Sequence, residues 1–226
     1  MIHKYNCVRI VPIFNHLDEA SMALIREKVR HRQLDKGEYL YQAGEQTNNL
    51  FVLHSGMVRV FRLVESGKEQ LVRILQAGDF MGEWSLFNAG HVHENYAQAM
   101  RSTSICMIQH EDMQEFLKEY PEISLKLLGE MSRRLDQSEK QATQLSTEQV
   151  GTRLAFFIAD QVQGDQDQDI ELELPISRKD IASYLGTTPE TISRKFKDLE
   201  KQGLIQQISS KKIKIPIVDD LLLYSE

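Results

Sequence analysis

The chain has 226 residues and a formal net charge of −6 at pH 7, and 41% of its residues are hydrophobic and 27% charged, as in a globular protein with one or two folded cores. No apolar run approaches the ~20 residues that span a bilayer, and the first residues lack the long apolar stretch of a signal peptide, so we expect a cytoplasmic protein without membrane contact. Only two cysteines occur, Cys7 and Cys106, which excludes a disulfide scaffold and a CxxC zinc site.

The first 120 residues predict a domain of short strands. Cys7 precedes an apolar run at 8–14, and Asp18 and Glu19 start a predicted helix at about 18–30. From about 33 to 109, segments rich in valine, isoleucine, phenylalanine and tyrosine alternate with glycine turns. The predicted strands lie at 39–42, 49–56, 57–65, 69–75 and 102–109. Short strands at this spacing favour an antiparallel sandwich or barrel.

A helical region follows, with a short helix at 111–119 and a long one that Pro121 starts and that runs to about residue 146. Apolar or small residues recur on it at alternating spacings of three and four: Leu128, Met131, Leu135, Ser138, Ala142 and Leu145. This spacing is typical of a two-stranded coiled-coil seam, so we assign 121–147 to dimerisation with a second copy of the chain. The alternative is a helix that packs against its own domain.

Residues 148–226 predict a helical domain with a β-wing. A helix at about 148–162 precedes a polar loop at 164–169 and a helix-turn-helix at 174–204. In that motif Ser177 is the N-cap of the first helix, Gly186 suits the left-handed residue that ends it, and Thr188 and Pro189 start the second. The segment 204–217 predicts two short strands, which form the wing.

The second helix of this motif carries side chains suited to reading DNA. Ile192, Phe196 and Leu199 share an inner face, and three polar residues near the start of the helix share the outer face: Glu190, Ser193 and Arg194. Arginine binds guanine bidentately, glutamate accepts from cytosine, and serine bonds a base or a phosphate. A helix-turn-helix presents this end of its second helix to the major groove. The alternative is a small helical hairpin with a solvated polar face.

The charge around the motif favours a nucleic-acid partner. Between Ser177 and Lys214 there are nine basic and four acidic side chains, which leaves this segment with a net charge of +5 in an acidic protein. We expect five of the basic residues to contact DNA phosphates: Arg178, Lys179, Lys195, Lys211 and Lys212.

A strand-rich domain, a long dimerising helix and a winged helix-turn-helix, in this order, resemble the CRP/FNR family of bacterial transcription regulators. The resemblance is strongest in GDFMGEWSLF (78–87) and ETISRKFKDLEKQGLI (190–205), where Glu190, Ser193 and Arg194 match the E-x-x-S-R pattern of the FNR branch. It implies an α+β fold with a jelly-roll barrel like a cyclic-nucleotide-binding domain. It also implies a homodimer that reads a TTGAT-type palindrome in double-stranded DNA and contacts RNA polymerase.

Two cofactors of the family are not expected here. Cyclic-AMP-binding relatives carry an Arg-Ser pair where this chain has His93 and Glu94, and Glu94 places a negative charge beside a phosphate. The FNR branch holds a [4Fe–4S] cluster on four cysteines, and two cysteines are too few within one chain, although a cluster bridging two protomers stays formally open.

We interpret Gly82 and Glu83 as a structural turn and two aromatic neighbours, Trp84 and Phe87, as core. We interpret three histidines as solvated rather than metal-binding: His91, His93 and His110.

The two-cysteine pattern resembles that of the FNR-like proteins of Gram-positive bacteria, in which the two equivalent cysteines form an intramolecular disulfide. This implies that oxidation joins Cys7 to Cys106 and alters the DNA-binding domain, because cytosolic disulfides are usually regulatory. The alternative is a pair of ordinary buried thiols.

No catalytic motif stands out, so we do not expect an enzyme. The sequence predicts a sequence-specific DNA-binding transcription regulator with a candidate redox switch at Cys7 and Cys106. Two alternatives remain: a regulator whose effector binds in the barrel pocket, and a sensor module that binds protein instead of DNA.

Overall fold

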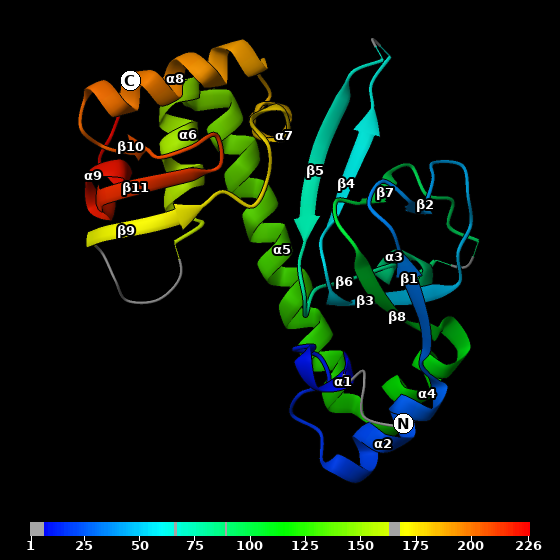
Figure 1. The fold of residues 1–226 in the computed structure, drawn as a ribbon. Coiled ribbons are helices and arrows are strands. Elements are labelled where there is room, and N and C mark those ends of the chain that lie inside the picture. Colours follow the sequence, from blue (N-terminus) through cyan, green and yellow to red (C-terminus); the bar gives the residue numbers. More distant parts are fainter. Residues whose placement is uncertain (1–6, 66, 89, 163–167) are drawn as a thin grey trace. The chain divides into compact units, whose positions relative to one another are not determined.

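The computed structural model describes residues 7–65, 67–88, 90–162 and 168–226 (Figure 1). The chain divides into two compact units, Met1–Leu135 and Asp136–Glu226, with the boundary inside the long helix α5 (Pro121–Thr147). Within the described ranges, every helix is too short or too polar to cross a membrane.

Among its described residues, the first unit forms two antiparallel sheets of four strands each, in agreement with the predicted antiparallel fold. One sheet has the order β1-β8-β3-β6 and the other the order β2-β7-β4-β5. The strands of the first are β1 (Arg30–Leu34), β8 (Thr103–Gln109), β3 (Asn49–Ser55) and β6 (Phe80–Met81). Those of the second are β2 (Tyr39–Tyr41), β7 (Tyr96–Ala99), β4 (Val58–Leu63) and β5 (Glu69–Leu75). Five of these strands lie where the sequence predicts them, and β1, β6 and β7 were not predicted.

Strands β3 and β8 of the first sheet are buried on both faces. Phe51 and Leu53 of β3 join a cluster shared by the two sheets, whereas Leu50 and Val52 join a second cluster with the helices. Successive side chains of a strand point to opposite faces, so a strand that is covered on both faces has a continuous apolar sequence. The segment NLFVLHS of β3 has such a sequence.

The helices of the first unit cover the outer face of this sheet. They are α1 (Cys7–Ile10), α2 (Glu19–Lys28), α3 (Glu83–Phe87), α4 (His110–Glu119) and the start of α5. Asp18 is the N-cap of α2 and accepts a hydrogen bond from Ser21 N at 2.8 Å. The helices predicted at about 18–30, at 111–119 and from Pro121 to about residue 146 correspond to α2, α4 and α5 and are confirmed.

The turn at Gly82 is structural, in agreement with the sequence interpretation. Gly82 has φ +90°, and a Cβ atom there would lie 2.3 Å from the carbonyl oxygen of Asn49 on β3. The interpretation of Trp84 and Phe87 as core is wrong, because each is 63% exposed. The residues from Glu83 to Phe87 form a short helix, which turns only one face inward, and Leu86 occupies that face.

The second unit combines helices with a small antiparallel sheet of order β10-β11-β9. Its elements after α5 are α6 (Val150–Ala159), β9 (Gln168–Glu173), α7 (Arg178–Tyr184), α8 (Pro189–Lys201), β10 (Gln206–Gln207), β11 (Lys212–Ile217) and α9 (Val218–Leu222). The loop predicted at 164–169 is partly wrong: residues 168 and 169 begin β9, and 163–167 lie outside the described residues. The alternation of Ile170, Leu172 and Leu174 is the signal for this strand.

Candidate nucleic-acid interface and cysteine site

Helices α7 and α8 form the predicted helix-turn-helix. Ser177 Oγ accepts from Asp180 N at 3.1 Å at the start of α7, and Thr188 Oγ1 accepts from Thr191 N at 3.3 Å at the start of α8. Gly186 adopts φ +65° between them, and Pro189 is the first residue of α8. These local signals fix the turn because each provides a hydrogen bond or a backbone conformation that a helix end requires.

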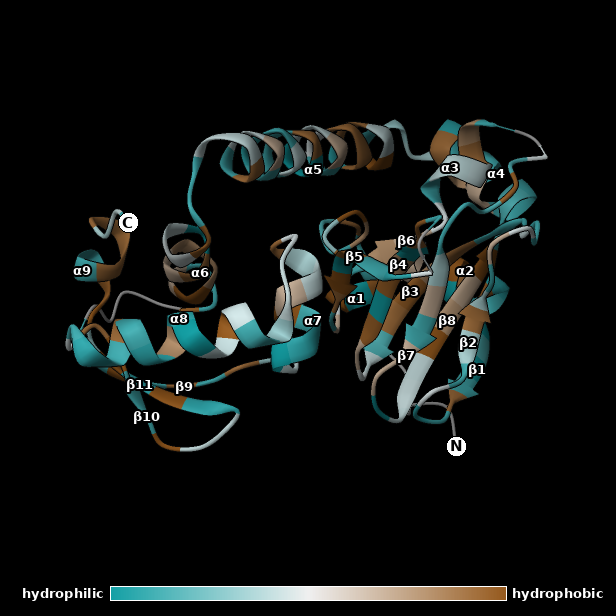
Figure 2. Ribbon diagram, turned by 90° about the horizontal axis from the view of Figure 1, so that it is seen from above, coloured by the Kyte–Doolittle hydropathy of each residue, from teal (hydrophilic) through white to brown (hydrophobic). Residues whose placement is uncertain are grey.

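The outer face of α8 presents Glu190, Ser193 and Arg194, all exposed, while Ile192 and Phe196 are buried on the opposite face. Figure 2 shows this mixture of hydrophilic and hydrophobic residues along α8. The backbone N–H of Glu190 and the hydroxyl of Thr188 lower the pKa of the Glu190 carboxyl, so it is ionised and accepts hydrogen bonds at neutral pH. The three residues together offer a carboxylate, a hydroxyl and a guanidinium on one surface.

The five basic residues predicted to contact phosphate differ in their surroundings. Lys179 and Lys211 are exposed. Lys212 pairs with Glu171 of β9 at 2.5 Å, and Lys195 forms an ion pair with Glu226. A lysine in such a pair reaches a phosphate only after leaving its partner, so these two are weaker candidates for phosphate contact than Lys211.

Arg178 ties the helix-turn-helix to the wing. Its guanidinium lies over the ring of Phe196, donates to Gln207 Oε1 at 2.9 Å and donates to the carbonyl of Ser210 at 3.3 Å. Burial lowers the pKa of Arg178 to about 10, which leaves it charged at neutral pH. The structure thus gives this residue a role inside the domain, in addition to the predicted phosphate contact.

The predicted dimer stripe of α5 is uncovered in the single chain. Leu128 is 64% and Leu135 60% exposed, and Ala142 is also exposed. Leu125, which the sequence analysis did not include, is more exposed still and lies three residues before Leu128. Met131 differs from the others, because it packs partly against the core of the first unit.

A buried carboxylate joins α3 to α5. Glu83 Oε1 accepts from Arg134 of α5 at 3.1 Å and from Arg73 of β5 at 3.3 Å. Arg134 also donates to the carbonyl of Phe80 at 2.9 Å and to Glu130 at 3.0 Å. This network could not be predicted from the sequence, because it joins residues that are 51 positions apart.

His93 is not a solvated loop residue, and that prediction is wrong. It is 7% exposed, its ring stacks on Tyr41 with centroids 3.7 Å apart, and its Nε2 lies 2.6 Å from Thr47 Oγ1. Its polar neighbours in the sequence gave no sign of this burial, which results from stacking on Tyr41 of β2. The next residue, Glu94, is exposed and pairs with Arg62 at 2.8 Å.

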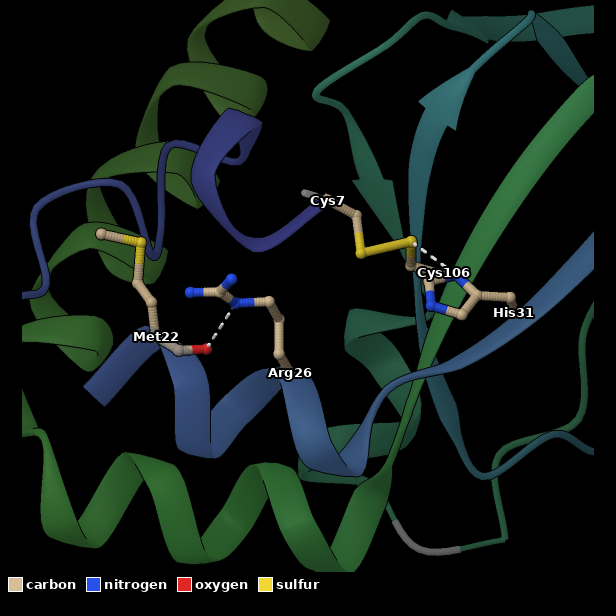
Figure 3. Close-up of a disulfide and its surroundings, with 5 residues drawn as sticks. All are labelled: Cys7, Met22, Arg26, His31 and Cys106. Carbon is tan, nitrogen blue, oxygen red and sulfur yellow. Dashed lines mark hydrogen bonds between the residues drawn. A yellow bond between two sulfur atoms is a disulfide. The ribbon is translucent and has the colours of Figure 1, made fainter. Parts of the chain in front are cut away.

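Cys7 and Cys106 are joined in a disulfide (Figure 3), as the resemblance implies. Their Cα atoms lie 6.5 Å apart, within the range that a disulfide spans, and both side chains are buried. The bond fastens the start of α1 to β8 in the middle of the buried sheet.

His31 lies beside this disulfide. It faces Cys106 directly in the register of β1 and β8, and its Nδ1 is 3.4 Å from Cys106 Sγ. Partial burial and the nearby His54 lower the pKa of His31, so its ring is neutral at pH 7. His31 was not among the predicted site residues, since only the pairing of β1 with β8 brings it to the cysteines.

Two family models match the chain. Residues 31–120 match the model described as a cyclic nucleotide-binding domain, and residues 152–223 match the one described as a Crp-like helix-turn-helix domain. The chain is 34% identical over 217 residues to the probable transcriptional regulator flp of Lacticaseibacillus casei, with 96% of this chain and 97% of that protein covered.

More distant similarities agree with this one. The chain is 29% identical over 179 residues to the fumarate and nitrate reduction regulatory protein of Escherichia coli K12, with 78% and 71% of the two chains covered. It superposes on a solved structure of a CooA variant from Carboxydothermus hydrogenoformans with a TM-score of 0.78 and 26% identity, over 93% of each chain.

Proposed function

The chain belongs to the CRP/FNR family of DNA-binding transcription regulators, and we propose that it binds a palindromic DNA site as a homodimer in the cytoplasm. We further propose that the redox state of Cys7 and Cys106 switches this binding. The observation that carries the proposal is the outer face of α8, where Glu190, Ser193 and Arg194 are exposed together at the start of the second helix of the motif. This is the part of a helix-turn-helix that meets base edges.

Each of the three side chains suits a base or backbone contact. Arg194 is suited to the O6 and N7 atoms of guanine, and the ionised Glu190 to the amino group of cytosine. Ser193 Oγ donates to the carbonyl of Pro189 at 2.8 Å, which leaves its lone pairs to accept from a base. Lys179 and Lys211 contact phosphates and set the orientation of the domain without carrying sequence information.

The α5 stripe supports the homodimer. Leu125, Leu128 and Leu135 expose a large apolar area to water in one chain, and a parallel copy of the same stripe covers it. Two-fold related reading helices match two half-sites about 34–36 Å apart on the duplex, so the recognised DNA is a palindrome.

The disulfide supports the switch. Oxidation of the two thiols forms the S–S bond, releases two protons and transfers two electrons to an oxidant such as diamide or a low-molecular-weight disulfide. Cys7 and Val8 pack in the same buried cluster as Ile123 and Leu127 at the start of α5. Constraining α1 therefore acts on the core that positions the dimer helix.

We propose a regulator without cyclic nucleotide or four-cysteine cluster, because one chain has only two cysteines and because His93 and Glu94 stand where cyclic-AMP-binding relatives carry an Arg-Ser pair. The surroundings of the two residues support this proposal: His93 is enclosed by Tyr41 and Thr47, and Glu94 is an exposed carboxylate that pairs with Arg62. The proposal also includes RNA polymerase as a protein partner and no catalytic activity.

The test of DNA recognition is fluorescence anisotropy with a TTGAT…ATCAA duplex, the same duplex with one half-site scrambled, and a fully scrambled duplex. We expect one dimer per palindrome and a large loss of affinity for each scrambled half-site, typically ~1–3 kcal/mol per mismatched base pair. Equal affinity for all three duplexes over a range of salt concentrations contradicts sequence-specific recognition.

A further inference from the structure

Cys7, Cys106 and His31 bring three metal-ligating atoms together in the first unit. We propose that, when the disulfide is reduced, these residues bind one Zn²⁺ ion per chain through two thiolates and the Nδ1 atom of His31. The proposal rests on the reversible disulfide of the proposed function, and it does not depend on DNA binding.

The distances suit this ion. The two sulfur atoms and the His31 nitrogen lie within 4.8 Å of one another, and Cys106 Sγ is 3.4 Å from His31 Nδ1. Zinc bonds of about 2.3 Å to sulfur and about 2.0 Å to nitrogen in a tetrahedron separate sulfur from nitrogen by about 3.5 Å and the two sulfurs by about 3.8 Å. The Cys106–His31 pair is already at this spacing, and the site forms when the sulfurs move apart after reduction.

The fold holds two of the ligands on paired strands. His31 and Cys106 are directly opposite each other on β1 and β8, so their side chains lie on the same face of the sheet. Cys7 reaches Cys106 from α1 (Figure 3). Val8 of α1 and Val11, which follows α1, are buried in the same cluster as Cys7 and keep α1 in place. The pairing of β1 with β8 preorganises the site, because strands move less than loops.

Burial and charge favour a metal over two free thiolates. Both cysteines are buried, where an isolated thiolate is costly, and a divalent cation compensates both negative charges. His31 lies on the exposed side of the group, so the ion enters there and solvent fills the fourth coordination position. Two thiolates and an imidazole suit zinc rather than magnesium or calcium.

The metal and the disulfide exclude each other. A phosphine reductant takes oxygen from water while the disulfide gains two electrons and two protons, and zinc then displaces the two thiol protons. Bound zinc thus protects the thiols from oxidation, and oxidation expels the ion. The same three residues consequently couple metal availability to the redox state of the proposed switch.

The test is an anaerobic titration of the full-length protein, reduced with a phosphine, with Zn²⁺ against a chromophoric chelator. Co²⁺ serves as a spectroscopic probe, because sulfur ligation gives a charge-transfer band and tetrahedral geometry gives intense visible bands. The variants are His31→Ala and Cys7→Ser, and His16→Ala is the matched control, since His16 is an exposed histidine of the same unit outside the site.

We expect one zinc ion per reduced wild-type chain, none after oxidation with diamide, and wild-type binding in the control. His31→Ala should weaken zinc binding at least about tenfold, since loss of even an outer-shell partner costs 10–100-fold. The proposal is overturned if protein with both thiols reduced binds no zinc. It is also overturned if His31→Ala binds zinc as tightly as the wild type. Because no DNA is present, a failure of DNA recognition leaves these outcomes unaffected.

Discussion

The disulfide should make a large and reversible contribution to the stability of the first unit. Cys7 and Cys106 are 99 residues apart in the sequence, so the bond closes a loop that includes both sheets. Closing a loop of about 100 residues reduces the entropy of the unfolded chain by an amount worth about 4.7 kcal/mol at 25 °C. We expect reduction to lower the free energy of unfolding of this unit by about that amount.

The assay is urea unfolding of oxidised and phosphine-reduced protein, followed by circular dichroism and by the fluorescence of Trp84, the one tryptophan of the chain. Cys7→Ser should unfold like the reduced wild type under both conditions. A difference below about 1 kcal/mol between the two wild-type forms would refute the entropic reasoning, because it falls far below the loop-closure value. If the reductant lowers the free energy of unfolding of Cys7→Ser as much as that of the wild type, the loss of stability does not come from this disulfide.

Three further variants test the second unit and the dimer helix. Arg194→Ala should cost ~1–3 kcal/mol of affinity for the specific duplex and relax preference at one base pair, measured by anisotropy, and an equal loss on scrambled DNA would contradict base reading. Arg178→Ala should destabilise the second unit by about 1–3 kcal/mol in thermal unfolding, because it removes charged hydrogen bonds to Gln207 and Ser210, whereas replacement of the exposed Lys211 by alanine should leave stability unchanged. Leu135→Glu should convert the dimer to a monomer in sedimentation velocity, because it buries two carboxylates in the seam, and a stable dimer would show that the seam lies elsewhere.

The helix-turn-helix could be predicted residue by residue because its signals are local. Ser177, Gly186, Thr188 and Pro189 each act on backbone groups within four positions, and all four occupy the predicted positions. The α5 helix is predictable for a similar reason, since Pro121 marks its start and its apolar spacing persists over several turns.

Features that depend on distant contacts could not be predicted. His93 is buried because Tyr41, 52 positions earlier in the chain, stacks on it, and its neighbouring residues are polar. Trp84 and Phe87 are apolar and yet exposed, because the short helix α3 turns Leu86 inward instead. His31 lies beside Cys106 only because of the register in which β1 pairs with β8. This register could not be predicted from the sequences of the two strands.

The measurement that tests the central claim most directly is binding to the TTGAT…ATCAA duplex by protein held in dithiothreitol and then in diamide, beside a Cys7→Ser control. We predict that the affinity of the wild type changes between the two conditions and returns when the reductant is restored, while Cys7→Ser binds equally in both. Strong and identical binding by both proteins in both conditions would contradict a switch at Cys7 and Cys106.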